Sequence, residues 1–513
     1  MKKSLHALLI LVAVALQGQA KFDHDAIDQW TQVLMESFQV PGVSVAIVNS
    51  SDIEFMKGYG VRMLGGEDPV DENTLFGIAS ISKSFTGLGL ALLEADGRIN
   101  WQDKVINYLP NFQMSDPWVT KEMTIMDLLT HRSGLTSIAG GTLWYGSDYD
   151  RSEVIQRLRY LQPVSSFRSK FDYQNIMYMV AGEIIPAVTD TTWDEFMQYR
   201  IFSPLGMVNS NTSITAFTES SNVAQAHAIL DGELQRIELR NHDNISAAAG
   251  INSTSQELCY YLQALLGDGV FQHEQVFSPN VTEELWLQRI PLKMKAPRPA
   301  EESAFTPVLY RSYGLGWIMV DHRGSERIYH SGGIDGLRSL VTMIPEKDLG
   351  IIVLANNESR EMVYALTEII LDMAWGIETY PWVQNVIDEA HADELEWQNE
   401  ISLDNMKRNK WKRPSIKARE LVGKYESKLY GQIEITGKRR DLRIRFTHTP
   451  SLTGKLSHWE GNTYLIKWLD PYIPRGFVTF QGDGNGKASG MELDQPELLD
   501  VDFTELHPIL RTE

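Results

Sequence analysis

The sequence contains very little cysteine. Its 513 residues include one, Cys259, so no disulfide can form within the chain and a folded core must supply the stability. Cys259 lies in the apolar helical run ELCYYLQALL, which indicates a buried small hydrophobic residue rather than a catalytic thiol. Cysteine chemistry is therefore disfavoured as the function.

Metal-binding patterns are also absent from the sequence. The 12 histidines are scattered, with no H-E-x-x-H motif and no cysteine cluster beside them. The glycine-rich stretch DGNGKASG, residues 483–490, lacks the acidic ligands and the final glutamate of a calcium loop and is predicted to be a turn. We therefore expect neither a metal ion nor another cofactor.

An excess of basic charge is lacking too. The chain has 47 lysines and arginines against 67 aspartates and glutamates, which gives a formal net charge of −20. Binding to nucleic acid requires a basic face that contacts the phosphates. The composition therefore excludes nucleic acid as an expected partner.

Only one long apolar run occurs, and it lies at the N-terminus. Lys2 and Lys3 precede the apolar residues 8–16, LLILVAVAL, and small residues follow up to Ala20. This pattern is typical of a secretory signal peptide over residues 1–20, cut after about Ala20. No later run reaches the roughly 18 apolar residues of a membrane-spanning helix. We expect a secreted or periplasmic protein without an integral membrane span once the signal is removed.

The chain is long enough for two domains. Residues 21–378 alternate helical and strand patterns, with strands indicated by GVSVAIVNSSDIEFMKGYG near the start and by YGLGWIMV, ERIYHSGG, SLVTMIP and LGIIVLAN near the end. Two early strands, a helical insertion and a set of closing strands predict an α+β domain. In such a domain both ends of the segment share one antiparallel sheet.

The pattern changes after this first domain. Residues 379–418 are strongly charged, acidic first and basic later, and we interpret them as a solvated helix or linker rather than a binding arm. Residues 419–513 contain short alternating strands separated by turns. They predict a small all-β domain, either a barrel or a sandwich.

The segment FGIASISKSFTGLGLALLEADG, residues 76–97, places reactive side chains at the start of a predicted helix. Ser80 and Lys83 are three residues apart, so their side chains lie on one helix face and can touch. A serine hydroxyl needs a neighbouring base, and a lysine whose pKa is lowered by burial can act as that base. The helix start adds N–H groups that stabilise an oxyanion. The pair therefore predicts a nucleophilic serine.

Two further segments carry candidate site residues. Tyr173 and Asn175 lie in FRSKFDYQNIMYMV at the start of another predicted helix, where the tyrosine can take a proton from the serine and the asparagine can bind a substrate amide. The alternative is a structural tyrosine with Asn175 as a helix cap. His330, Gly332 and Gly333 lie in the predicted strand RIYHSGGIDGLRS, whose glycines let a substrate approach the backbone N–H groups. The alternative for His330 is a satisfied core histidine.

The motifs S-x-x-K, Y-x-N and H-x-G, in this order, resemble the serine β-lactamase and penicillin-binding-protein superfamily. The similarity covers about residues 22–376 and is supported by TLFGIASISKSFTG, TIMDLLTHRSGL and HSGGIDGLRSLVTMIPEKDLGIIVLAN. The chain looks most like the class C-like serine hydrolases, which include D-aminopeptidases, DD-carboxypeptidases and esterases. The resemblance implies an α+β, β-lactamase/transpeptidase-like fold with a helical subdomain. The C-terminal segment is similar to a lipocalin-like barrel that caps the cleft or supports oligomers in some of these peptidases.

The resemblance also implies a role for each candidate residue. Ser80 is the expected acylated nucleophile, Lys83 its partner and Tyr173 the general base for acylation. Asn175 is expected to position the substrate amide, and the backbone N–H groups of Ser80 and Gly333 to form the oxyanion hole. Each proton-transfer group in such a mechanism contributes roughly 10²–10⁴ in rate.

The chain departs from the lactamase pattern at His330-Ser331-Gly332, where efficient class C β-lactamases carry K-T-G. The change removes a permanent cation from the site of the antibiotic's carboxylate and disfavours antibiotic hydrolysis. We expect a serine hydrolase that forms an acyl-enzyme with a small peptide, amide or ester, a peptidase ahead of an esterase. A penicillin-binding DD-carboxypeptidase, a weak β-lactamase and a non-catalytic acyl-binding sensor or scaffold are the alternatives. The sequence leaves open whether the protein forms a homo-oligomer.

Overall fold

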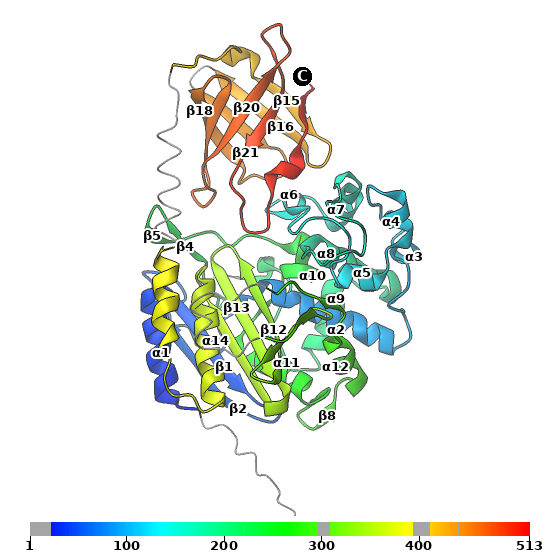
Figure 1. Ribbon diagram of the computed structural model, residues 1–513, viewed down its shortest axis with the longest axis vertical. Coiled ribbons are helices and arrows are strands. Elements are labelled where there is room, and N and C mark those ends of the chain that lie inside the picture. Colours follow the sequence, from blue (N-terminus) through cyan, green and yellow to red (C-terminus); the bar gives the residue numbers. More distant parts are fainter. Residues whose placement is uncertain (1–21, 219, 295–307, 393–410, 439–440, 513) are drawn as a thin grey trace, which may run out of the picture.

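The structure is a computed structural model that describes residues 22–218, 220–294, 308–392, 411–438 and 441–512 (Figure 1). The predicted signal peptide lies outside the described residues, and so does the part of the charged segment at 393–410. Within the described ranges, no helix is both long enough and apolar enough to cross a membrane.

An eight-stranded antiparallel sheet forms the centre of the first domain, in the order β2-β1-β14-β13-β12-β11-β10-β9. Its strands are β1 (Gly42–Val48), β2 (Ile53–Gly60), β9 (Ile290–Pro291), β10 (Arg311–Tyr313), β11 (Ile318–His322), β12 (Ser325–Ile334), β13 (Leu337–Ile344) and β14 (Leu349–Ala355). β1 pairs with β14, with Val45 opposite Val353. Every residue of these two strands is buried, which fits their aliphatic sequences. The predicted sharing of one sheet by the two ends of the domain is confirmed.

Helices cover both faces of this sheet (Figure 1). α1 (His24–Ser37) and α14 (Arg360–Ala374) pack over one face. α2 (Ser82–Ala95), α8 (Asn175–Thr189) and α11 (Ser255–Leu266) belong to a larger core on the other face. Further α-helices of the first domain are α3 (Val105–Tyr108), α4 (Pro117–Glu122), α5 (Ile125–Leu129), α6 (Gly141–Trp144), α7 (Arg151–Arg157), α9 (Trp193–Met197), α10 (Ser246–Ala249) and α12 (Pro279–Trp286). The α+β architecture is as predicted.

Within the described residues, three short two-stranded ribbons lie outside the main sheet. They pair β3 (Phe76–Gly77) with β6 (Asn252–Ser253), β4 (His227–Leu230) with β5 (Glu233–Arg236), and β7 (Val270–Phe271) with β8 (Glu274–Gln275). The first ribbon is important for the site, because it anchors the chain directly before Ser80.

The C-terminal residues form a closed eight-stranded barrel. Its strands are β15 (Gly423–Ser427), β16 (Gly431–Lys438), β17 (Asp441–Phe446), β18 (Thr453–Glu460), β19 (Thr463–Trp468), β20 (Gly476–Gly482), β21 (Ala488–Asp494) and β22 (Ile509–Arg511). Along β17, DLRIRF, exposed and buried residues alternate, because successive side chains point to opposite faces of the barrel wall. The predicted all-β domain is confirmed, and it is a barrel rather than a sandwich.

The barrel packs against the helical part of the first domain, next to α6 and α7 (Figure 1). The Tyr149 hydroxyl donates to the carbonyl of Tyr430, and Arg157 donates to the carbonyl of Leu429 at 2.7 Å. Apolar side chains of both domains belong to one contiguous core. The barrel is therefore docked on the domain that carries the candidate site.

Candidate active site

Ser80 lies in a short 3-10 turn, η1 (Ala79–Ile81), that leads directly into α2. The residue before it, Ala79, has a left-handed backbone with φ of 49°, a conformation that costs an alanine of order 1–3 kcal/mol. The Ile78 N–H donates to the carbonyl of Ile251 at 2.9 Å and fixes this strained segment. Ser80 is 8% exposed, so its hydroxyl can still be reached. The chain thus presents Ser80 at the start of a helix, as predicted.

Lys83 lies one turn further along and is fully buried. Its Nζ is 3.0 Å from the Ser80 Oγ, 2.7 Å from the Asn175 Oδ1 and 3.0 Å from the carbonyl oxygen of Ala248. Burial lowers the pKa of Lys83 to about 7, and the negative charge of Asp500 opposes this shift. Near neutral pH, Lys83 therefore exists in both protonation states, and its neutral form can accept the Ser80 proton.

Tyr173 is stacked beside this pair. The Lys83 Nζ is 4.6 Å from the centre of its ring, and its hydroxyl is buried without a hydrogen-bond partner among the described residues. Burial raises the pKa of Tyr173 well above its usual value, although the neighbouring Ser80 hydroxyl offsets part of this effect. Tyr173 is therefore a neutral phenol at neutral pH, with a hydroxyl available to a ligand.

Asn175 is the first residue of α8, and its side chain does not cap the helix. The N-cap residue is Gln174, without a side-chain cap, so the alternative of Asn175 as a cap is wrong. The amide oxygen of Asn175 accepts from Lys83, and its Nδ2 donates to the Asp500 Oδ2 at 2.8 Å. Asn175 thus links the lysine of the site to a carboxylate from elsewhere in the chain.

Asp500 is a site residue that the sequence did not reveal. It belongs to the barrel, in the loop between β21 and β22, and has a left-handed backbone with φ of 62°. This loop packs closely on α6: a Cβ added at Gly141 would lie 2.2 Å from the carbonyl oxygen of Asp500. The separation of 325 positions in the sequence between Asn175 and Asp500 explains the omission, because no local pattern joins two such distant positions.

His330 lies on β12 and is buried close to Tyr173. Its Nδ1 is 2.7 Å from the Ser331 carbonyl, so Nδ1 carries the proton, and its Nε2 accepts from the Tyr313 hydroxyl at 3.3 Å. Burial and the charge of Lys83 lower the pKa of His330 to about 3. Both ring nitrogens have hydrogen-bond partners, as expected for the alternative of a core histidine. The ring nevertheless belongs to the site, because its centre lies 6.2 Å from that of the Tyr173 ring. The histidine is neutral and supplies no cation to the site.

The glycines after His330 bring β12 against the Ser80 segment. A Cβ added at Gly332 would lie 2.1 Å from the carbonyl oxygen of Ile78, a backbone atom. β12 pairs with β13 up to Ile334, but its pairing with β11 ends at Tyr329. From His330 onward, one edge of β12 therefore has no strand partner among the described residues, and its backbone groups can bind a substrate.

A second histidine and two tyrosines complete the surroundings and were not predicted. The His131 ring lies 4.6 Å from that of Tyr173, and its Nδ1 accepts from the Gln174 N–H at 3.0 Å. Tyr178 and Tyr313 pack on the same imidazole. His131 lies in the segment TIMDLLTHRSGL, at the end of a helical pattern. Nothing in this pattern distinguishes a site histidine from a buried structural one. These rings exclude water around Lys83 and so account for its lowered pKa.

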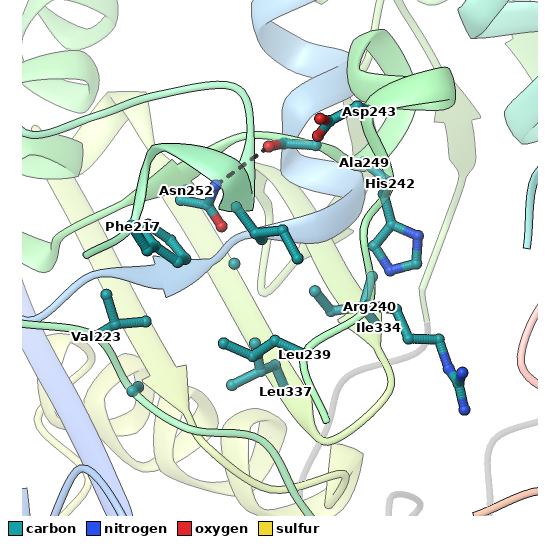
Figure 2. A pocket seen from close by; sticks show the side chains of 14 residues that line it. Phe217, Val223, Leu239, Arg240, His242, Asp243, Ala249, Asn252, Ile334 and Leu337 are labelled. Carbon is teal, nitrogen blue, oxygen red and sulfur yellow. Dashed lines mark hydrogen bonds between the residues drawn. The ribbon is translucent and has the colours of Figure 1, made fainter. Parts of the chain in front are cut away.

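A narrow pocket adjoins the site (Figure 2). Three of its lining residues are chain neighbours of site groups: Gly77 precedes η1, Ala249 follows Ala248, and Ile334 follows Gly333. The other lining residues are largely apolar: Ile214, Phe217, Val223, Ala224, Leu239, Arg240, His242, Asp243, Gly250, Asn252 and Leu337. Its free space is about 10 Å³, roughly one water molecule. Figure 2 shows Leu239 and Leu337 within it and the guanidinium of Arg240 pointing away.

A serine beside a buried lysine of lowered pKa, at the start of a helix that packs on an antiparallel sheet, is the arrangement expected of a serine hydrolase of the β-lactamase and penicillin-binding-protein class. The chain belongs to the β-lactamase family: the family profile described as Beta-lactamase matches residues 27–372. Residues 407–507 match a second family, described as a domain of unknown function, DUF3471.

Individual relatives agree with this assignment. The unguisins hydrolase ungD′ of Aspergillus campestris is 28% identical over 372 residues, which are 69% of this chain and 66% of that protein, just under two thirds of its length. Penicillin-binding protein 4* of Bacillus subtilis is 26% identical over 64% of this chain and 70% of its own. The octameric penicillin-binding protein homologue from Pyrococcus abyssi has a similar structure, with a TM-score of 0.61 and 21% identity over 93% of this chain and 99% of that chain.

Proposed function

We propose that this protein is a serine hydrolase that cleaves, through an acyl-enzyme, an amide bond whose acyl part carries a free amino group. One observation carries the choice of substrate: the Asp500 carboxylate lies 2.8 Å from Asn175, the residue expected to position the substrate amide. A carboxylate at this point attracts an ammonium group and repels a substrate carboxylate. The proposal is thus an aminopeptidase or amino-amidase activity.

In the first step, neutral Lys83 accepts the proton of the Ser80 hydroxyl as Oγ bonds to the substrate carbonyl carbon. The negative charge that develops on the carbonyl oxygen is stabilised by the N–H groups of Ser80 and Gly333, a type of donor worth roughly 10²–10³ in rate. Collapse of this intermediate breaks the carbon–nitrogen bond. The result is an acyl-Ser80 ester and a departing amine.

The departing amine receives a proton from the Tyr173 hydroxyl, which regains one from the Lys83 ammonium. The raised pKa of Tyr173 keeps its hydroxyl protonated at neutral pH, so the phenol is not available as a base, and we therefore assign the role of base in acylation to Lys83. In the second step, water loses a proton to Lys83 and attacks the ester. The acid product is released and Ser80 regains its hydrogen.

Substrates that carry a carboxylate, such as β-lactam antibiotics or peptides cut near their C-terminus, suit this site less well. His330 occupies the position of the lactamase lysine and is neutral, because its pKa is lowered to about 3. The site therefore offers a fixed anion, Asp500, and no fixed cation at His330. This distribution favours the aminopeptidase over the DD-carboxypeptidase and the β-lactamase.

We also propose that the protein is exported and loses residues 1–20. The support is the sequence alone, two lysines followed by a short apolar run and small residues. N-terminal sequencing of the protein recovered from the medium or periplasm of expressing cells is the test. A mature N-terminus near Lys21 supports export, and an intact N-terminus on protein retained in the cytoplasm contradicts it.

The enzymatic proposal is tested with alanyl p-nitroanilide in both stereochemical forms, the same compounds acetylated at nitrogen, p-nitrophenyl acetate and a chromogenic cephalosporin. We expect turnover of the free-amine anilides, weak turnover of the acetylated ones and loss of all turnover in Ser80→Ala. Asp500→Asn should lower kcat/KM for the free-amine anilides about tenfold or more relative to kcat/KM for the ester at the same pH, as expected for a lost charge pair.

Intact mass, measured alongside, distinguishes the alternatives. An adduct with the cephalosporin that persists without product points to a penicillin-binding or sensing role and contradicts the aminopeptidase. Turnover of acetylated and free-amine anilides at equal rates leaves the hydrolase standing and removes Asp500 as the determinant of specificity. Full activity in Ser80→Ala contradicts the mechanism itself.

A further inference from the structure

The turn between β12 and β13 lies two residues from the proposed oxyanion donor, Gly333. Ile334 is paired with Leu337, which leaves Asp335 and Gly336 as a two-residue loop. The two-residue turns that suit the twist of a hairpin have a positive φ at the first loop residue. Here only the second, Gly336, has a positive φ, of 73°. The turn therefore does not have the geometry that a free hairpin prefers, and contacts from outside must hold it.

One such contact reaches the turn from the barrel through Arg240. The Asp335 carboxylate accepts from the Tyr145 hydroxyl at 2.7 Å and from the Arg240 guanidinium. Arg240 in turn donates to the Asp470 Oδ2 at 2.7 Å, and Asp470 belongs to the barrel loop between β19 and β20. The side chains of Asp335 and Arg240 are only 3% and 9% exposed, so solvent screens this pair weakly.

A second contact reaches the same turn through Tyr472, two residues further along the barrel loop. The Tyr472 hydroxyl donates to the carboxylate of Glu358, and the same carboxylate oxygen accepts the N–H of Gly336 at 3.2 Å. Tyr472 also lies against the Arg240 guanidinium, 5.6 Å from ring centre to carbon. The barrel thus holds the side chain of one loop residue and the backbone of the other.

The position of the turn matters because no strand supports one side of the segment before it. Among the described residues, β12 has no strand partner on the β11 side beyond Tyr329, so His330 to Ile334 depend on β13, on the contact of Gly332 with the Ile78 carbonyl and on the turn for their position. Catalytic rate is sensitive to the position of such groups, because a displacement of about 1 Å of a reacting group can decrease the rate about 10²-fold.

We infer that the barrel positions the oxyanion hole, through Asp470 and Tyr472 acting on the Asp335-Gly336 turn. Both are positioning residues, since neither touches the reacting atoms. The inference rests on the proposed function, because it concerns acylation of Ser80. It assigns the second domain a part in catalysis beyond the carboxylate of Asp500.

The test uses the full-length protein and a fluorophosphonate, which reacts with an activated serine without requiring the natural substrate. Ser80 Oγ bonds to phosphorus, fluoride leaves, and the phosphoryl oxygen occupies the oxyanion hole. We expect Asp470→Asn and Tyr472→Phe each to slow labelling about tenfold, a fraction of the roughly 10²–10³ of a lost oxyanion donor. With an anilide that the wild type cleaves, kcat should fall likewise and KM should stay nearly constant.

The matched control is Asp148→Asn, which removes a charge from the same interface at a contact that does not involve the turn, the 2.7 Å pair with His448. It should label at the wild-type rate. Hydrogen exchange should show faster exchange of the 333–337 amides in Asp470→Asn and not in Asp148→Asn. Because both act through Arg240, Asp335→Asn and Asp470→Asn should be non-additive in the double variant.

The outcomes separate the two proposals. If the wild type is not labelled at Ser80, the proposed function fails. If it is labelled, and the Asp470 and Tyr472 variants keep its rate and its exchange pattern at 333–337, this inference is overturned while the hydrolase stands. Equal slowing in Asp148→Asn also overturns it, because the effect would then come from docking in general.

Discussion

At the scale of single residues, the chemistry depends on what surrounds Lys83. A lysine side chain in water has a pKa near 10.4, so at neutral pH it is protonated and cannot act as a base. Full burial among His131, Tyr173 and Tyr178 lowers the pKa of Lys83 to about 7, and Asp500 limits the decrease. The barrel carboxylate therefore has two effects, on the substrate and on the base.

These opposing effects predict the pH dependence. Acylation requires neutral Lys83, so kcat/KM should rise with pH along a limb centred near 7 and reach a plateau above it. Asp500 stabilises the ammonium form, so Asp500→Asn should move this limb to lower pH. The measurement is kcat/KM between pH 5 and 9 with an uncharged ester, so that substrate titration does not contribute. A limb that moves to higher pH contradicts this account, and Asp502→Asn, in the same loop, serves as a control.

Residues whose role follows from local spacing could be predicted from the sequence, and the others could not. Ser80 and Lys83 are one helical turn apart, and Tyr173 and Asn175 begin a helix, so each pair forms a recognisable motif. Asp500 has a role only because the folded barrel brings it to Asn175. Within the segment ELLDVDFTEL, no sequence pattern distinguishes Asp500 from the other acidic residues.

At the scale of elements, β12 and η1 are held together at van der Waals contact. The Ser339 hydroxyl, on the neighbouring strand β13, donates to the Ile78 carbonyl at 2.9 Å. Gly332 faces the same carbonyl and leaves no room for a side chain. The distance between the two proposed oxyanion donors is therefore set by a backbone-to-backbone contact, which is more rigid than contact between side chains.

Gly332→Ala should accordingly disrupt the site. The added methyl group would lie 2.1 Å from the Ile78 carbonyl oxygen, so β12 or η1 must move. We expect a decrease in kcat of about 10²-fold, the cost of a displacement near 1 Å. Gly482→Ala is the matched control, a glycine in a strand whose added Cβ would have its nearest neighbour at 3.6 Å. A Gly332→Ala protein with the wild-type kcat contradicts the close-contact argument.

The elements themselves were largely predictable. β1 and β14 are aliphatic strands with turns beside them, and each pattern is visible in the sequence. The sequence also predicted an open strand edge at the glycines after His330, but not its origin: β12 lies between β13 and β11 in the sheet, and its edge opens where the pairing with β11 stops at Tyr329. The sequence thus indicates which segments are strands, whereas register decides which of their edges meet a substrate.

At the scale of the whole molecule, the barrel is part of the site. Sequence patterns predicted the barrel, since alternation and turns are local, but they did not predict its docking. The docking depends on contacts between residues far apart in the sequence, such as Tyr149 with Tyr430. The archaeal homologue, similar over 93% of this chain, shows that the fold of both domains occurs together elsewhere.

Glu505 is expected to make the stability of this docked arrangement depend on pH. It lies in η8 (Phe503–Leu506), and its carboxylate accepts from the N–H groups of Gly140 at 2.7 Å and Thr142 at 2.9 Å, and from the Thr142 hydroxyl. Burial raises the pKa of Glu505 to about 7, and these hydrogen bonds offset part of the increase. Between pH 4.5 and 7 the folded protein holds a proton that the unfolded chain has lost. Its contribution to stability therefore decreases as pH rises through this range, by about 3 kcal/mol at most.

Glu505→Gln removes the titration and should remove this decrease. The measurement is Tm at pH 5 and pH 8 for both proteins, since the difference between them cancels every other titrating group. We expect the wild type to lose more Tm than Glu505→Gln on going from pH 5 to pH 8. A difference that stays constant would show that the carboxylate is already ionised at pH 5, stabilised by its three donors. In that case the docking of the barrel, and with it the placement of Asp500, would be independent of pH in this range.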